Sequence, residues 1–164
     1  MKKDYIRVVV RGVILVDAHI LIARSKDATN TFLPGRHVEF GENLPAALIR
    51  ELFEEVGLCI QVSDYLGMVE HKWVESVHEV SLKENRHRHQ INHVFAAVLP
   101  RVHTLPTLES REDHLEFFWV LLSELSEHNL MPPPLIKLVE HFMKGDRAYF
   151  GILLSQPKFS PKPR

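Results

Sequence analysis

Carboxylates are concentrated in one short segment of the chain, residues 35–58, which reads GRHVEFGENLPAALIRELFEEVGL. Glu51, Glu54 and Glu55 follow directly after Arg50, and Glu42 precedes them. On a helix, at about 100° per residue, Glu51 and Glu55 share one face and Glu54 lies beside them. Like charges at this spacing repel each other by a few tenths of a kcal/mol per pair. The cluster therefore indicates either a solvated acidic face or a site for a cation.

The ligand types favour a hard divalent cation over other metals. Grouped carboxylates suit Mg²⁺, which keeps several waters and commonly bridges to substrate phosphates. Arg50 can form a forked ion pair with one glutamate and hold it in a fixed orientation. The turn at Pro34 and Gly35 brings backbone carbonyls and amides to the same place. The segment therefore fits a Mg²⁺ site, with a solvated acidic face as the alternative.

The elements that must position this segment can be predicted from periodicity and turn residues. Asn43 can cap the amino end of a helix, Leu48 and Leu52 share its apolar face, and Gly57 lies where the helix ends. Alternating or apolar runs predict strands, and charged or proline-rich segments predict loops. We expect strands at 5–16, 20–24, 37–40, 58–80, 91–99 and 114–122, a hairpin loop at 81–90, helices at 43–57 and 133–145, and a helical turn at 122–130.

Length and composition fit a single domain. The chain has 164 residues, 45% of them hydrophobic, and a formal net charge of −1. This charge gives no global attraction to nucleic acid or to an anionic membrane. With Cys59 as the one cysteine, no internal disulfide is possible, which fits a reducing compartment. We expect a cytoplasmic protein with one domain at 1–154 and a mobile, proline-rich basic tail at 155–164.

The spacing of the charged residues resembles the Nudix box, the family pattern G-x5-E-x7-R-E-U-x-E-E-x-G-U, where U is a bulky aliphatic residue. Eight of the nine fixed positions match, from Glu42 through Arg50 and the glutamates to Gly57 and Leu58. With each residue type at roughly 6%, the six non-aliphatic matches have a chance on the order of 10⁻⁸ per window. The resemblance implies a Nudix-type α/β/α sandwich around a mixed sheet, covering most of residues 5–143.

The resemblance also implies an activity and roles for particular residues. The activity is hydrolysis of a nucleoside diphosphate linked to another moiety, with one to three divalent cations. Glu51, Glu54 and Glu55 are the implied metal ligands, together with the carbonyl of Gly35. Arg50 is expected to orient Glu51, and Glu42 to support the loop or a second metal. The implied catalytic set is Arg50, Glu51, Glu54 and, as the general base before Trp119, Glu112.

One position departs from the family pattern. The box should begin with glycine, and this chain has Arg36 there. If the family glycine serves a positive φ, arginine strains the turn. Arg36 is therefore a tolerated substitution, a cation aimed at a substrate phosphate, or the mark of a Nudix-fold module that binds a nucleotide without turning it over.

Other features leave alternatives open. The histidines His87, His89 and His93 are either a metal site or incidental polar residues, and their spacing matches no zinc signature. Aromatic and histidine side chains either stack on a nucleobase or belong to the core: Phe32, His37, Trp73, His93 and Phe95. We expect a small-molecule nucleotide as the substrate, no nucleic-acid or membrane partner, and a possible homodimer.

Overall fold

The chain folds into a mixed sheet with helices on both faces. The computed structural model describes residues 5–79, 82–146 and 149–154. Its elements are β1 (Ile6–Val16), β2 (His19–Ser25), β3 (Thr31–Phe32), α1 (Leu44–Val56), β4 (Gln61–Glu79), β5 (Leu82–Val98), β6 (Leu115–Leu121), the 3₁₀ helix η1 (Leu122–His128), α2 (Pro134–Met143) and β7 (Tyr149–Leu154). The seven-stranded sheet has the order β3-β2-β1-β5-β4-β7, and β6 pairs with β2.

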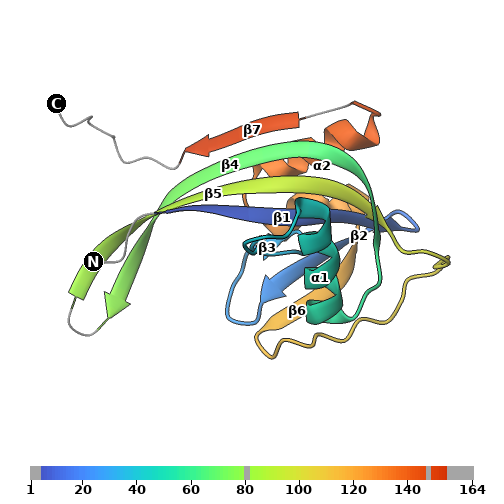
Figure 1. Ribbon diagram of the computed structural model, residues 1–164, viewed down its shortest axis with the longest axis horizontal. Coiled ribbons are helices and arrows are strands. Elements are labelled where there is room, and N and C mark those ends of the chain that lie inside the picture. The colour runs from blue at the N-terminus through green and yellow to red at the C-terminus, as the bar shows by residue number, and fades with distance from the viewer. Residues whose placement is uncertain (1–4, 80–81, 147–148, 155–164) are drawn as a thin grey trace.

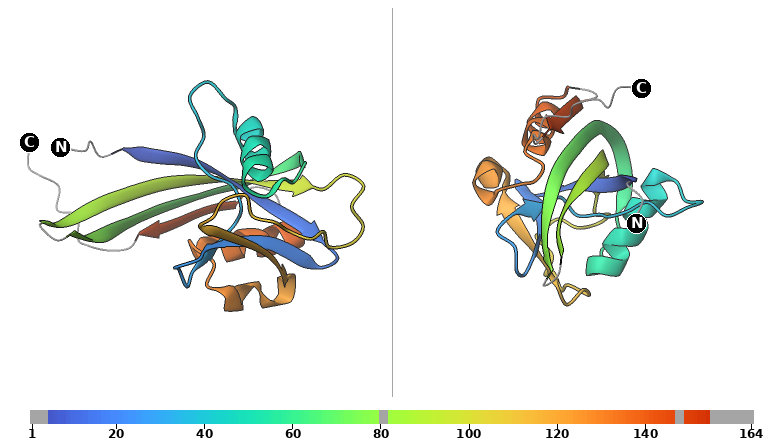
Figure 2. Two further views of the ribbon diagram at one scale, coloured as in Figure 1. Left: turned by 90° about the horizontal axis from the view of Figure 1, so that it is seen from below. Right: turned by 90° about the vertical axis from the view of Figure 1, so that its left-hand side faces the viewer.

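The helices enclose the sheet as the family resemblance predicts. Helix α1 lies on one side of the strands, whereas α2 and η1 lie on the other (Figures 1 and 2). Strands β1 and β5 are parallel, as are β4 and β7, whereas β4 and β5 are antiparallel. The predicted α/β/α sandwich around a mixed sheet is confirmed.

Strand β1 lies in the interior of the sheet and is apolar on both faces. Val10 and Ile14 pack into the cluster beneath α1, and Val13 packs into the cluster on the α2 side. Alternate residues of a strand point to opposite faces. Burial of both faces therefore explains the nearly continuous apolar sequence of β1. Arg11 interrupts that run on the same face as Val13.

Helix α1 begins and ends where the sequence predicts. The Asn43 side chain accepts a hydrogen bond from the Ala46 amide at 2.9 Å, which satisfies one free amide of the first turn. Gly57 has φ 71°, and the amide of Leu58 donates to the carbonyl of Leu52 at 3.2 Å. This left-handed glycine cap ends the helix. Both ends of the glutamate-bearing segment are therefore fixed locally.

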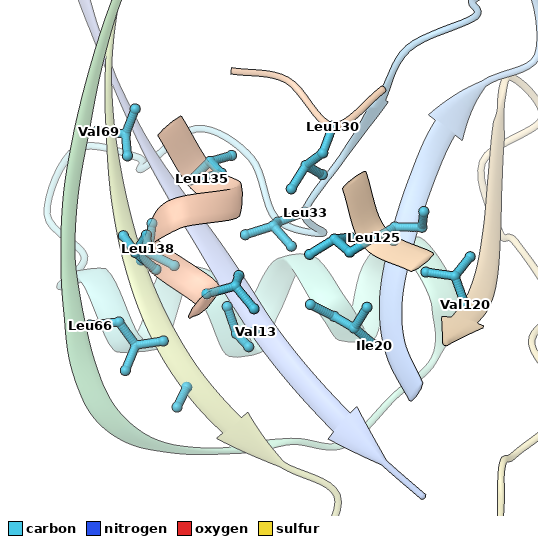
Figure 3. Packing of buried hydrophobic residues seen from close by; sticks show 14 residues of the cluster. Val13, Ile20, Leu33, Leu66, Val69, Val120, Leu125, Leu130, Leu135 and Leu138 are labelled. Atoms are coloured by element: carbon cyan, nitrogen blue, oxygen red, sulfur yellow. The ribbon is translucent and has the colours of Figure 1, made fainter. Parts of the chain in front are cut away.

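Helix α2 covers the opposite face of the sheet. Figure 3 shows Leu135 and Leu138 of α2 packing with Val13 and Val69 of the sheet, next to Leu125 of η1. Each of these side chains is at most 3% exposed. Burying a side chain of this size contributes roughly 1.5–3 kcal/mol. This cluster anchors the sheet against which α1 packs from the other side.

The predicted hairpin loop at 81–90 is wrong. Strand β5 begins at Leu82, and its pairing with β4 runs from Glu79↔Leu82 to Gln61↔Val98. Charged side chains are accommodated by cross-strand contacts, which stabilise a solvated strand pair. The Glu70 carboxylate accepts hydrogen bonds from Lys72 at 2.7 Å and from His89 at 2.9 Å. The loop prediction failed because residues 82–90 become a strand through backbone pairing with β4, which their own composition does not indicate.

Two smaller differences concern the segment before α1 and the last strand of the sheet. Residues 37–40 do not form the predicted strand, because the Glu42 carboxylate accepts from the Glu39 amide at 2.7 Å and turns the chain. Strand β7 was not predicted and adds to the sheet beside β4. The expected tail at 155–164 lies outside the described residues. None of the helices that the structure describes is long and apolar enough to cross a membrane.

Candidate active site

Arg50 ties the glutamates of α1 to the loop that precedes the helix. Its guanidinium forms a forked ion pair with Glu42, with Nη2–Oε1 at 2.7 Å and Nε–Oε2 at 3.1 Å. Nη1 also donates to Glu51 at 2.8 Å and to Glu54 at 3.1 Å. Hydrogen bonds to the carboxylates raise the pKa of Arg50, and the bond to Glu42 has the largest effect. The side chain of Arg50 therefore remains a cation. The expected contact with Glu51 is present, but the fork falls on Glu42.

Glu51 and Glu55 lie on the buried side of α1, with only 6% and 2% of their surface exposed. A merely solvated acidic face is therefore excluded. Burial raises the pKa of Glu51 by more than its hydrogen bond from Arg50 lowers it. Burial, and then the charge of Glu51, raises the pKa of Glu55 to about 7. Among the described residues, Oε2 of Glu55 has no hydrogen-bond partner.

The turn opposite these carboxylates requires glycine at one position. Gly35 has φ 112°, and a Cβ added there would lie 2.4 Å from the carbonyl oxygen of Val10. Hydrogen bonds to β1 fix both neighbours, since the carbonyls of Pro34 and Arg36 accept from the Gly12 and Val10 amides, each at 2.9 Å. Arg36 itself does not have a positive φ. The strain expected at Arg36 is therefore absent.

Arg11 is a site residue that sequence reasoning missed. Its Nη1 donates to the carbonyl of Leu33 at 2.9 Å and also to that of Gly35. The guanidinium lies over the ring of Phe32, 5.2 Å from its centroid. Burial lowers the pKa of Arg11 to about 10, although Glu55 and Glu51 oppose the shift. Arg11 is thus a half-buried cation at ordinary pH, and its one sequence signal was a charge inside an apolar strand.

Glu112 belongs to a loop that docks on the carboxyl end of α1. The Arg111 amide donates to the carbonyl of Glu55 at 2.7 Å, and its guanidinium donates to that of Phe53 at 2.9 Å. Glu112 itself is partly exposed and lies 3.6 Å from Nδ1 of His114. No hydrogen bond or ion pair joins Glu112 to the glutamates of α1 in the described chain. Its assignment as the general base stays a prediction.

The aromatic and histidine side chains considered for nucleobase stacking do not line one pocket. Phe95 packs under α1, and His93 points to the same face, with Nδ1 2.9 Å from the Tyr65 hydroxyl. Trp73 stacks on His71, with ring centroids 4.5 Å apart, on the opposite face by strand alternation. Phe32 lies under Arg11, and His37 bridges to β1.

The histidines His87, His89 and His93 do not form a metal site in the part of the chain that the structure describes. The side chain of His89 contacts Glu70, whereas that of His93 contacts Tyr65.

Both the sequence and the fold match known proteins. Residues 6–142 match the family model of the NUDIX domain. The E. coli ORF135 protein is 29% identical with a TM-score of 0.55, over 85% of this chain and 89% of that one. A MutT protein from Bacillus halodurans is 19% identical with a TM-score of 0.65, over 89% and 88%. An ADP-ribose pyrophosphatase from Streptococcus suis is 14% identical with a TM-score of 0.57, over 89% and 98%.

A search of the curated proteins finds no match. The family model nevertheless spans nearly all of the described residues and includes α1 with its three glutamates, Arg50, and Glu42 just ahead of the helix. Because this match extends over residues 6–142, the chain belongs to the Nudix hydrolase family.

Proposed function

We propose that the chain hydrolyses the pyrophosphate linkage of a nucleoside diphosphate joined to another moiety, such as a nucleoside triphosphate or a nucleotide sugar, with a divalent cation at the glutamates of α1. The observation that carries this proposal is Glu55, whose buried Oε2 has no donor among the described residues. An unpaired buried acceptor is costly to the fold. Its retention on this helix is explained if a cation binds there.

The donor set fits Mg²⁺ or Mn²⁺, and Nudix hydrolases generally use divalent ions. Glu51, Glu54, Glu55 and the carbonyl of Gly35 are the residues that would hold the ion. As the side chains stand, no three carboxylates converge on one point within the described residues. Arg50 accounts for this, because it engages Glu51 and Glu54. Arg50 bonds only one oxygen of each, Oε1 of Glu51 and Oε2 of Glu54, so a cation could take the other oxygen of each carboxylate while Arg50 stays in place.

The cation and the side chains would have separate roles in the reaction. When bound, a divalent cation neutralises phosphate charge and lowers the pKa of a water. Arg50 restrains Glu51 and fastens the preceding loop through Glu42. Glu54, with 55% of its side chain exposed, is accessible to solvent and can accept a proton. The more distant Glu112 is the second candidate for this role.

The alternative of a binding module without catalysis is now unsupported by any particular residue. It depended on strain at Arg36, and Arg36 has no positive φ. The hydrolase is therefore the function that the site supports best.

The test is release of phosphate or pyrophosphate from a panel of substrates with Mg²⁺ or Mn²⁺. The panel contains nucleoside triphosphates, nucleotide sugars, ADP-ribose and dinucleoside polyphosphates. Glu55→Gln keeps the side-chain shape but removes the charge, so turnover should fall at least about 100-fold. Glu124→Gln makes the same change on exposed η1 and should leave turnover intact. Absence of turnover across the panel by the natural sequence would refute the proposal.

A further inference from the structure

Arg36 combines a fixed backbone with an exposed side chain. Its carbonyl accepts from the Val10 amide at 2.9 Å, and the Val38 amide donates to the Val8 carbonyl at 3.2 Å. The segment is therefore held against β1 on both sides of Arg36. The guanidinium is exposed and, in the described chain, makes no hydrogen bond or ion pair. A long cationic side chain is thus presented from a rigid base.

The surroundings of Arg36 are charged but not paired with it. Burial raises the pKa of Glu51 and Glu55, and the charge of Arg36 opposes both rises, so its guanidinium lies within electrostatic range of these carboxylates. Burial, then Arg7, then Arg36 lower the pKa of His37. Arg7 and Arg36 thus add positive charge around His37, within electrostatic range of the buried carboxylates of α1.

Arg36 does not neutralise the carboxylates, although they are close to it. Glu51 is engaged by Arg50, and Glu55 is buried, so pairing with Arg36 would require its guanidinium to lose water. Desolvating a cation costs several kcal/mol. The unpaired guanidinium is therefore available to a ligand that arrives with its own negative charge.

We propose that Arg36 binds a phosphate group of the substrate and favours nucleotides that carry a third phosphate over those that carry two. This inference rests on the proposed function. Under that function, the two phosphates that flank the cleaved bond would lie at the glutamates of α1, and a further phosphate would bring negative charge that the exposed guanidinium of Arg36 can meet. A guanidinium presents a planar fork that matches two phosphate oxygens. Arg36 occupies the position where the family pattern has glycine, which has no side chain to offer.

The test measures binding separately from turnover. The probes are a non-hydrolysable nucleoside triphosphate with a methylene bridge and inorganic pyrophosphate, titrated by calorimetry with Mg²⁺. Arg36→Gln should raise the Kd of the triphosphate analogue about tenfold or more, as expected for a lost charge-assisted contact, and change that of pyrophosphate less. Arg36→Lys should lie between Arg36→Gln and the natural sequence. Lys137→Gln, an equal charge change on exposed α2, should leave both constants unchanged.

A second measurement distinguishes a phosphate contact from support of the turn. Mn²⁺ affinity without nucleotide, followed by electron paramagnetic resonance, should stay the same or tighten up to about fivefold in Arg36→Gln, because a repelling charge is removed. Parallel weakening of Mn²⁺ and analogue binding would mean that Arg36 acts through the turn, and would overturn the inference. An unchanged Kd for the analogue would also overturn it.

The two proposals can fail separately. If the natural sequence turns over substrates and Arg36→Gln binds the analogue normally, only the inference fails. If the natural sequence hydrolyses nothing but binds the analogue through Arg36, only the hydrolase proposal fails. No binding of the analogue by the natural sequence overturns the inference, whatever the turnover.

Discussion

The buried carboxyl of Glu55 makes the stability of the metal-free protein depend on pH in an unusual direction. Glu55 is 2% exposed, and burial followed by the charge of Glu51 raises its pKa from 4.5 to about 7. A carboxyl with a raised pKa binds its proton more tightly in the folded chain than in the unfolded one. Its contribution to stability is therefore complete below pH 4.5 and is lost as pH rises through about 7.

The size of this loss follows from the shift. A pKa unit corresponds to about 1.4 kcal/mol, so a rise from 4.5 to about 7 gives about 3 kcal/mol in total. Between pH 5 and pH 8 the change is about 2.5 kcal/mol. Glu55→Gln has a similar shape but no proton to lose. The free energy of unfolding of Glu55→Gln minus that of the natural sequence should therefore increase by about 2.5 kcal/mol from pH 5 to pH 8.

The assay is urea unfolding in the presence of a chelator at pH 5, 6, 7 and 8. Any constant cost of placing an amide at position 55 cancels, because the prediction concerns the change with pH. Glu124→Gln serves as the control and should follow the natural sequence at every pH. Parallel curves for Glu55→Gln and the natural sequence would refute the reasoning. Adding Mg²⁺ at pH 8 should stabilise the natural sequence and not Glu55→Gln.

Two further predictions concern the turn and the cation beneath it, and both are measured by chemical unfolding. Gly35→Ala should lower the free energy of unfolding by about 3 kcal/mol, because its Cβ would lie 2.4 Å from the carbonyl oxygen of Val10. Gly41→Ala should lower it by only about 1 kcal/mol, because its backbone is strained but no atom lies within 4 Å of the added Cβ. Equal costs would contradict this assignment. Arg11→Met should cost at least about 2 kcal/mol, because the Gly35 carbonyl loses a buried donor. Arg7→Met, on the same strand, should cost under about 1 kcal/mol, and a similar loss for both would exclude a special role for Arg11.

The sequence predicted α1 well because the features that define it are local. Asn43 caps the helix, Gly57 ends it, and Leu48 and Leu52 recur at the helical period. Each of these depends on neighbours within four residues, so spacing alone is informative. The contact between Arg50 and Glu51 was predictable for the same reason, because both lie on one helix.

Features that depend on distant parts of the chain could not be predicted in this way. Residues 82–90 carry many charges, and the β4 ladder that makes them a strand cannot be inferred from their own composition. The fork of Arg50 falls on Glu42 because the loop returns over α1. Arg11 contacts Gly35 only after β1 and the turn pair, so its role was hidden although its charge was visible in the apolar run.

The site keeps charges of both signs unsatisfied within a short distance, and folding alone would not favour that arrangement. Glu55 is buried without a donor for Oε2, while Arg36 remains exposed without an acceptor in the described chain. Pairing these two groups would require the guanidinium of Arg36 to lose water, and the hydrogen bonds of Pro34 and Arg36 to β1 hold the turn in place. The buried oxygen of Glu55 therefore costs stability, as is common at functional sites, whereas the exposed guanidinium of Arg36 is solvated by water. A ligand that brings a divalent cation together with extra phosphate charge would satisfy both groups at once.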